Sequence, residues 1–277
     1  RFLVFLSSRK SWTLPYIIFS AIFVIIPLFL IVVYAFTDDS GHLTLANFQK
    51  FFEHPEAINT FVYSIGIAII TTLICILLGY PAAWILSNSK LNRSRTMVVL
   101  FILPMWVNFV LRIMAWQLLL SRNGIINAIL GAFGLPGQDL ANSNVAIVIG
   151  MVYDYLPFMI LPVYNAVTEL NEDILEAARD LGAPPKAVLT KIMIPLTMPG
   201  IISGITMVFV PSLTTFAIPD ILGGGKIMLI GNIIEQEFST SMNWNLGSGL
   251  SIALMIFVLI SMMFTSKTDA GKERSVW

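Results

Sequence analysis

Apolar side chains occur along this chain in long, nearly uninterrupted runs that are separated by shorter polar segments. A helix needs about 20 consecutive apolar residues to cross the hydrocarbon core of a bilayer. Open strands would leave backbone groups unpaired in lipid, so each run is expected to be a helix. Six runs come close to this length: residues 14–36, 61–86, 97–120, 145–167, 200–219 and 250–265. The pattern therefore predicts an all-α polytopic membrane protein with six transmembrane helices, embedded in a lipid bilayer.

The composition agrees with this pattern. Of the 277 residues, 57% are hydrophobic and 12% are charged, whereas a soluble domain has about 25% charged residues. The net charge is zero, so no overall field favours nucleic acid as a partner. The single cysteine, Cys75, excludes an intramolecular disulfide. The two histidines, His42 and His54, have no partners at metal-ligand spacing, and no metal site is expected.

Lys and Arg residues are spread unevenly between the two sides of the membrane that six spans define. The two termini and the second and fourth connecting segments carry twelve of them: Arg1, Arg9, Lys10, Lys90, Arg93, Arg95, Arg179, Lys186, Lys191, Lys267, Lys272 and Arg274. The opposite segments carry three: Lys50, Arg122 and Lys226. Because cytoplasmic loops carry the excess of basic residues, both termini are expected in the cytoplasm.

One cytoplasmic segment, ILEAARDLGAPPKAVLTKIMIPL (residues 174–196), is much more polar than the apolar runs around it. Asn171 is expected to cap a helix that begins at Glu172, where the helix dipole favours acidic residues. Gly182 suits the left-handed position that ends a helix. Four apolar residues share one face of this helix at helical spacing: Ile174, Leu175, Ala178 and Leu181.

A second short helix is expected over residues 186–193, since Pro184 and Pro185 are tolerated at a helix start. Pro195 and Pro199 then mark a bend into the fifth span. The segment is therefore predicted to be two short amphipathic helices joined at a glycine corner. The residues alone leave two interpretations open, an ordinary surface loop and a docking site for a partner.

The spacing in this segment resembles the EAA signature of ABC importer permeases, which is E-A-A, three residues, G, nine residues and I-x-L-P. Six positions match, with Ile194 in place of the usual Leu: Glu176, Ala177, Ala178, Gly182, Ile192 and Pro195. The resemblance implies a type I ABC importer permease fold in which residues 168–198 form the coupling loop to a separate ATPase subunit, with Asp180 added to the coupling residues. It also implies that ATP and Mg are bound by that partner, because this chain has no nucleotide-binding motif. This chain would then bind no cofactor and be no enzyme itself.

Three longer stretches, residues 152–166, 176–204 and 220–238, resemble the permease of bacterial spermidine/putrescine importers. The resemblance implies a plasma (inner) membrane location and a heterodimer with a second homologous permease subunit. It further implies two ATPase subunits and an extracytoplasmic polyamine-binding protein. Three parts of the chain follow from it: an N-terminal tail with the first span and outer loop, a permease core of five spans, and a C-terminal tail, at residues 1–60, 61–266 and 267–277.

Ionisable residues inside membrane spans are rare and indicate a functional role. Two lie well inside the predicted spans, Arg112 in the third and Asp154 in the fourth. Counted from the outer ends of their spans they lie at a similar depth, so they could form an ion pair. Asp154 has a second interpretation, as a carboxylate for a cationic substrate, flanked by Tyr153 and Tyr155. We favour the ion pair, because an unpaired buried Arg would be costly.

A polyamine path would need carboxylates and aromatic faces, because the solute is a flexible multivalent cation. Asp220 lies at the outer end of the fifth span without a basic residue beside it, and with Phe216 it is the preferred substrate contact. The alternative is a solvated loop carboxylate. Trp106, close to Arg112 in sequence, completes the predicted path. Pro211 is expected to interrupt the fifth helix near mid-membrane.

These observations leave several functions open. The leading one is a permease subunit of an ATP-driven polyamine importer. The same architecture could carry another small solute, such as an amino acid, an oxyanion or thiamine. A transporter or channel that acts without ATP is a different class, and it leaves the coupling-like segment unexplained. A membrane enzyme is disfavoured, because the spans contain no nucleophile–base pair, carboxylate dyad or metal cluster in their sequence.

Overall fold

The computed structural model describes residues 13–53, 55–88, 101, 103–136 and 140–273. Seven of the basic residues used above lie outside this part of the chain, as does most of the beginning of the predicted third span: Arg1, Arg9, Lys10, Lys90, Arg93, Arg95 and Arg274. The described residues form helices joined by loops and contain no strand, apart from one isolated bridge between Thr37 and Leu43. The predicted all-α class is confirmed.

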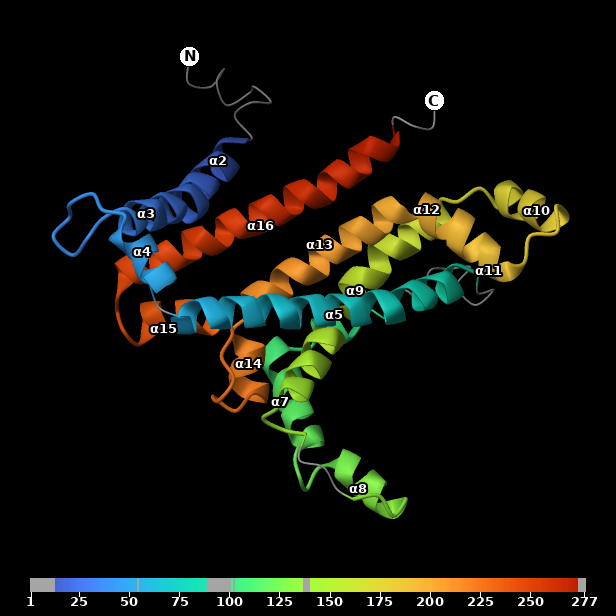
Figure 1. The fold of residues 1–277 in the computed structure, drawn as a ribbon, viewed down its shortest axis with the longest axis horizontal. Coiled ribbons are helices and arrows are strands. Elements are labelled where there is room, and N and C mark those ends of the chain that lie inside the picture. The colour runs from blue at the N-terminus through green and yellow to red at the C-terminus, as the bar shows by residue number, and fades with distance from the viewer. Residues whose placement is uncertain (1–12, 54, 89–100, 102, 137–139, 274–277) are drawn as a thin grey trace. The chain divides into compact units, whose positions relative to one another are not determined.

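Four of the six predicted spans coincide with long apolar helices (Figure 1). The first consists of α2 (Leu14–Ser20), a π-helical turn (Ala21–Ile25) and α3 (Ile26–Ala35). The others are α5 (Pro55–Asn88), α9 (Asn144–Thr168) and α16 (Trp244–Glu273). Prolines in the interiors of α5 and α9 do not end these helices, as is common in membrane spans, where neighbouring groups satisfy the freed backbone.

The third span differs from its predicted bounds of 97–120. A 3₁₀ turn occupies Leu103–Trp106, and the helix α7 begins only at Phe109 and ends at Leu120. Asn108 causes this late start, since its side chain accepts hydrogen bonds from the backbone N–H groups of residues 110 and 111 and so caps the helix. A further helix, α8 (Ile125–Ala132), follows, and the two together are long and apolar enough to cross a membrane.

The fifth span also differs from its prediction. The helix α13 covers Met198–Thr214 and passes through Pro211 without a break, and a short helix α14 (Ala217–Leu222) follows. Thr214 Oγ1 donates a hydrogen bond to the carbonyl of Val210, so a hydroxyl group satisfies one carbonyl beside the proline. The sharp change of direction lies earlier, at Thr197, where α13 meets the preceding helical segment at 69°. Counted as one bent span, this pair brings the candidate membrane spans among the described residues to six.

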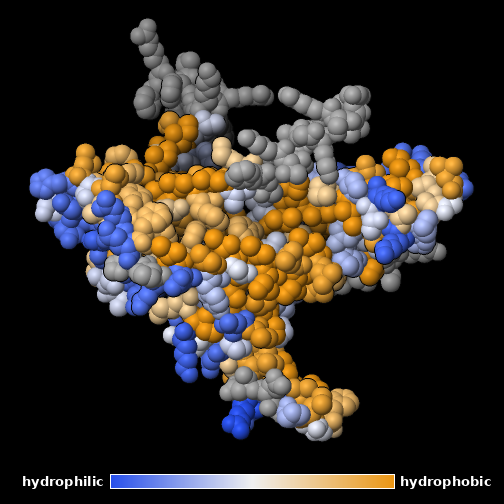
Figure 2. All heavy atoms as spheres, in the orientation of Figure 1, coloured by the Kyte–Doolittle hydropathy of each residue, from blue (hydrophilic) through white to orange (hydrophobic). Residues whose placement is uncertain are grey.

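The chain divides into two compact units, residues 1–58 with 233–257 and residues 59–232 with 258–277. In the second unit, α9 packs closely on α13 through small residues. A Cβ atom at Gly200 would lie 2.6 Å from the carbonyl oxygen of Pro162, and one at Gly204 would lie 2.6 Å from Met159 Sδ. Small residues let membrane helices approach closely, because association there depends on packing. Figure 2 shows apolar residues over the middle of these helices and polar residues at the end that carries α10.

In the first unit, α3 ends in a loop that leads to α4 (Ala46–Glu53). The last carbonyl groups of a helix have no partner within the helix. Here the buried amide of Asn47 donates to the carbonyls of Ala35 and Thr37, at 3.1 and 2.9 Å. The loop is thereby tied to the end of α3.

The predicted division of the chain into three parts, with boundaries at residues 60 and 266, stays a prediction.

Candidate functional site

The segment between α9 and α13 begins with α10 (Glu172–Asp180), which starts where the sequence predicts. Asn171 Oδ1 accepts a hydrogen bond from the backbone N–H of Asp173 at 3.0 Å and caps the helix. Gly182 has φ +79°, the left-handed conformation expected at the end of the helix. The N–H of Ala183 then bonds to the carbonyl of Ala178 at 3.0 Å, which closes the turn in a Schellman motif. The capped helix and the glycine corner are both confirmed.

The apolar face of α10 is divided between the protein and the solvent. Leu175 and Ala178 are partly buried and pack against the core of their unit. Ile174 is 46% exposed and Leu181, beside the glycine corner, is 89% exposed. The shared apolar face is thus only partly covered by the protein, and Leu181 is the last residue before the chain turns. The corner therefore presents a large apolar side chain to its surroundings.

The second predicted helix is present and longer than expected. It runs from α11 (Pro185–Ala187) through a π-helical segment (Val188–Met193) to α12 (Ile194–Leu196). It ends at the 69° bend between Pro195 and Pro199, as the sequence predicts. At the bend, the buried hydroxyl of Thr197 lies 3.2 Å from the hydroxyl of Tyr80 on α5. The bend is thus held to a long membrane helix.

The predicted coupling residues are placed on this segment in two groups. Glu176, Ala177, Asp180 and Gly182 are exposed on or beside α10. Ile192 is partly buried, and Pro195 is exposed just before the bend. Their spacing along the chain therefore places them on two different short helices (Figure 1). Their role in coupling stays a prediction.

Arg112 on α7 and Asp154 on α9 lie together, each on a helix long and apolar enough to belong to a membrane span. Arg112 Nη2 is 3.1 Å from Asp154 Oδ1, and the two side chains are 11% and 2% exposed. Arg112 Nη1 also donates to the carbonyl of Pro104 at 3.2 Å. Within the described part of the chain, neither carboxylate oxygen of Asp154 accepts a hydrogen bond, so the pair is held by charge. A carboxylate without this counter-ion would be left buried and uncompensated.

The two tyrosines beside Asp154 point to different neighbours. Tyr153 packs edge-to-face on Trp116 of α7, with the ring centroids 5.4 Å apart. Tyr155 is buried, and its hydroxyl donates to the carbonyl of Pro211 on α13 at 3.4 Å. Of these three consecutive residues, only Tyr153 lines the neighbouring cavity of about 410 Å³, which it shares with Phe101, Pro104, Arg112, Leu156, Pro157 and Ile160. Tyr153 and Tyr155 therefore do not line one common surface beside Asp154.

Asp220 and Phe216 both lie at α14, four residues apart, and both are exposed. Side chains with this spacing are neighbours on a helix. The helix packs on α7 and α9, since Gln117 Nε2 donates to the carbonyl of Ile221 at 3.0 Å and a Cβ at Gly150 would collide with Leu222. Gly150 precedes Asp154 by about one helical turn. Asp220 is thus carried by a helix that touches both helices of the ion pair. Trp106, at the end of the 3₁₀ turn, is 80% exposed.

Three polar residues that are not among the predicted site residues hold α14 and the loop after it. Asn232 donates to the carbonyl of Phe216 at 2.9 Å and accepts from the N–H of Leu229 at 3.0 Å. Ser64 on α5 accepts from the N–H of Ile230 at 2.8 Å. Gln117 is the third. Each is a polar residue within or beside an apolar run, which is the one signal in the sequence that would have marked it.

Among the described residues, no group of three or more His, Cys, Asp or Glu side chains is arranged to hold a metal ion. The buried thiol of Cys75 has the carbonyl of Val152 as its neighbour at 4.0 Å. The predicted site residues in the described part of the chain include a buried ion pair, Arg112 with Asp154, and an exposed carboxylate on a short helix, Asp220.

Comparison with known proteins gives consistent results. Residues 76–268 match the family described as the binding-protein-dependent transport system inner membrane component. The chain is 37% identical over 262 residues to the spermidine/putrescine transport system permease protein PotB of Haemophilus influenzae, across 92% of this chain and 91% of that protein. It is 36% identical to PotB of Escherichia coli, across 87% of this chain and 90% of that protein.

Solved structures support the fold. A bacterial ABC transporter that imports the acidic polysaccharide alginate superposes with a TM-score of 0.79 at 16% identity, across 94% of this chain and 93% of that chain. A second structure of the alginate transporter, in complex with a periplasmic protein bound to an alginate pentasaccharide, gives a TM-score of 0.78. The fold is that of an ABC importer permease. With the family match covering more than half of its length, the chain belongs to the binding-protein-dependent transport system inner membrane components.

Proposed function

We propose that this chain is the permease subunit of an ATP-driven importer that carries spermidine and putrescine into the cytoplasm. The substrate class rests on the two relatives at 36–37% identity that are named for these solutes. The coupling to ATP hydrolysis is proposed from one structural observation. The segment from α10 to α12 has a capped first helix and a sharp turn at Gly182, and it exposes the apolar side chain of Leu181.

The segment has the mechanical features that a coupling element needs. The helix α10 is closed at both ends, by Asn171 and by the turn at Gly182, so it can move as one body. The following helix reaches Thr197, which is bonded to Tyr80. A force applied at the corner would therefore pass to α5 and α13 together. The ATP and Mg would be bound by the ATPase subunits.

The proposed substrate path includes Asp220 and Phe216, with Tyr153, Trp106 and, after separation from Arg112, Asp154. A carboxylate beside an aromatic side chain attracts an organic cation by charge and by the electron-rich ring face. Asp220 on α14 and Phe216 at its N-cap are both exposed and four residues apart, so a solute can reach both side chains. While Arg112 neutralises Asp154, that carboxylate is a poorer ligand for a cation.

The proposed assembly contains a second homologous permease, two ATPase subunits and an extracytoplasmic polyamine-binding protein. The family description names binding-protein-dependent transport, and the second alginate transporter structure holds a periplasmic protein. Both termini and the α10–α12 segment face the cytoplasm in this proposal, in agreement with the distribution of Lys and Arg.

Uptake of labelled spermidine by liposomes tests the proposal. The chain is reconstituted with the products of its neighbouring genes, and uptake is measured with ATP, without ATP, and with other solutes. We expect uptake that requires ATP and the ATPase subunits. Uptake of spermidine by this chain alone, without ATP, would refute the importer. ATP-driven uptake of another solute, with none of spermidine or putrescine, would refute the substrate and keep the architecture.

The coupling segment has its own test. Glu176→Lys reverses a charge on the exposed face of α10, and Gly182→Asp places a side chain at φ +79°. Both variants should reach the membrane in normal amounts and lose ATP-driven uptake or assembly with the ATPase subunits. Normal uptake in both variants would exclude this segment as the coupling element.

A further inference from the structure

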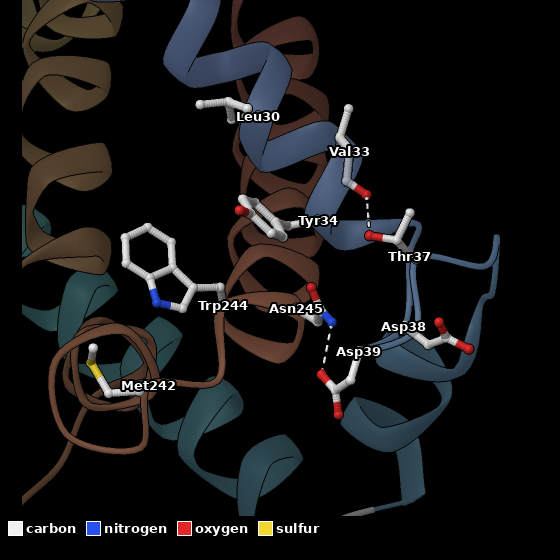
Figure 3. Close-up of a pocket in the computed structure, with 10 residues that line it drawn as sticks. Leu30, Val33, Tyr34, Thr37, Asp38, Asp39, Met242, Trp244 and Asn245 are labelled. Carbon is white, nitrogen blue, oxygen red and sulfur yellow. Dashed lines mark hydrogen bonds between the residues drawn. The ribbon is translucent and has the colours of Figure 1, made fainter.

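A second pocket lies at the C-terminal end of the first span, where α3 passes into its loop and α16 begins (Figure 3). Its volume is about 630 Å³. All of its walls belong to the first compact unit, and it is lined by Leu30, Val33, Tyr34, Thr37, Asp38, Asp39, Gly41, Met242, Trp244 and Asn245. The lining contains two carboxylates, and it contains no Lys, Arg or His among the residues that the structure describes.

Two aromatic rings form the apolar part of this pocket. The ring of Tyr34 and the indole of Trp244 have centroids 6.1 Å apart and planes inclined by 47°. The two residues are 39% and 50% exposed, so ring surface is open on both. An electron-rich aromatic face attracts an ammonium group within about 6 Å of its centroid, most strongly when the ring is an indole. The two rings thus provide exposed aromatic surface in the lining of the pocket.

The two carboxylates of the pocket differ in what they can bind. Asp39 Oδ1 accepts a hydrogen bond from Asn245 Nδ2 at 3.0 Å, and Asn245 is only 9% exposed. A buried amide therefore holds this carboxylate in one orientation. Figure 3 shows the Asp39 side chain directed to the same side of the loop as Trp244. Its second oxygen has no hydrogen bond from the described residues.

Asp38 is directed away from the rings and serves the loop (Figure 3). Its Oδ1 accepts from the backbone N–H groups of Ser40 and His42, both at 2.9 Å. The hydrogen bond from His42 lowers the pKa of Asp38, as do the bond from Ser40 and the charge of the imidazole, whose Nδ1 lies 3.8 Å from Oδ2. Asp38 is thereby occupied, whereas Asp39 is positioned and available.

We propose that this pocket binds a primary ammonium group, with Asp39 as the anion and Tyr34 and Trp244 as the aromatic walls. The site shares no residue with the path proposed along α7, α9 and α14, and it does not depend on which solute is transported. Two sources can supply the group: a free polyamine, or the headgroup of phosphatidylethanolamine. The second is relevant because Tyr and Trp side chains at the ends of membrane helices lie at the level of lipid headgroups.

The test uses the assembled transporter with 5-fluorotryptophan in nanodiscs, and the ¹⁹F resonance of Trp244 is assigned with Trp244→Phe. One set of discs contains phosphatidylglycerol alone and is titrated with spermidine. The other set contains phosphatidylethanolamine and receives no polyamine. Asp39→Asn is the test variant, because an amide oxygen can still accept from Asn245 while the charge is lost. Asp38→Asn is the matched control, because it removes one charge from the same loop and keeps an acceptor for Ser40 and His42.

A free polyamine at this site would give a saturable shift of the Trp244 resonance in the phosphatidylglycerol discs. Asp39→Asn should weaken that binding by about threefold to tenfold, and Asp38→Asn by less than about twofold. A lipid headgroup at this site would instead give a difference between the two disc types that Asp39→Asn removes and Asp38→Asn keeps. No response in either set, or equal effects of the two variants, would overturn the proposal.

Discussion

Tyr80 and Thr197, which are 117 positions apart in sequence, meet through their hydroxyl groups at 3.2 Å in the interior of the protein. Thr197 Oγ1 also donates to the carbonyl of Met193 at 2.8 Å, so the hydroxyl of Tyr80 is the donor to Thr197. The contact lies at the 69° bend that separates the α11–α12 segment from α13. It connects the polar corner of the chain with the long helix α5, and its loss should affect the transfer of movement between them.

The variant Tyr80→Phe removes this hydrogen bond and keeps the ring. A buried neutral hydrogen bond contributes about 1 kcal/mol to stability, so the melting temperature of the assembled transporter should fall by a few degrees at most. The amount of spermidine taken up per ATP hydrolysed should also fall, because the bend is less firmly held. The measurement is ATP hydrolysis and spermidine uptake in the same liposomes. An unchanged ratio of uptake to hydrolysis would show that the contact serves stability alone.

Leu181 gives a different expectation, because its side chain is 89% exposed and supports no core. Leu181→Ser should leave the melting temperature of the isolated permease unchanged and weaken its binding to the ATPase subunits by about tenfold, as expected for an apolar residue that enters a pocket on a partner. Binding is measured by surface plasmon resonance with the permease in nanodiscs.

The control for Leu181 is Leu135→Ser. Leu135 is also exposed, at 54%, and belongs to the segment that the charge distribution assigns to the opposite side of the membrane. Leu135→Ser should leave the affinity of the permease for the ATPase subunits unchanged. Equal weakening by both variants would indicate a general loss of solubility or assembly, and would remove Leu181 from the interface.

Close helix packing makes Gly200 sensitive to the smallest enlargement. A Cβ atom there would lie 2.6 Å from the backbone oxygen of Pro162, which cannot move aside as a side chain could. Gly200→Ala should therefore separate α9 from α13 and destabilise the protein by about 1–3 kcal/mol. Gly66→Ala in α5 is the control, since no atom lies within 4 Å of its added methyl group. Thermal unfolding in detergent compares the two variants, and an equal stability of both would contradict the packing described here.

The sequence was most informative where local backbone chemistry decides the structure. Asn171 and Gly182 act through hydrogen bonds and a dihedral angle within a few residues, so their roles followed from residue type and spacing alone. The membrane helices were equally predictable from the sequence, because the cost of unpaired backbone groups in lipid permits few alternative structures. The start of α7 was missed although its cap, Asn108, is also local, because the apolar run continues on both sides of it.

Contacts between residues far apart in the chain could not be predicted from residue type and spacing. Asn232, Ser64 and Tyr80 each bond to a group that the sequence does not place beside them. The exposure of Leu181 follows from the position of the corner relative to the core, and helical periodicity cannot give that position. Arg112 and Asp154 were an exception, because a charge inside a membrane span needs a partner at its own depth.

The ion pair gives the last prediction. Arg112→Leu or Asp154→Leu would leave the other charge buried and uncompensated, which costs about 3–5 kcal/mol. The double variant, with both residues replaced by Leu, removes both charges and should recover most of the stability that either single variant loses. Thermal unfolding of the four proteins in one detergent measures this coupling. If Asp154 serves only Arg112, the double variant should also recover uptake of spermidine. A double variant that is stable and inactive would instead assign Asp154 a direct role in the passage of the solute, whereas equal and additive losses would contradict the ion pair itself.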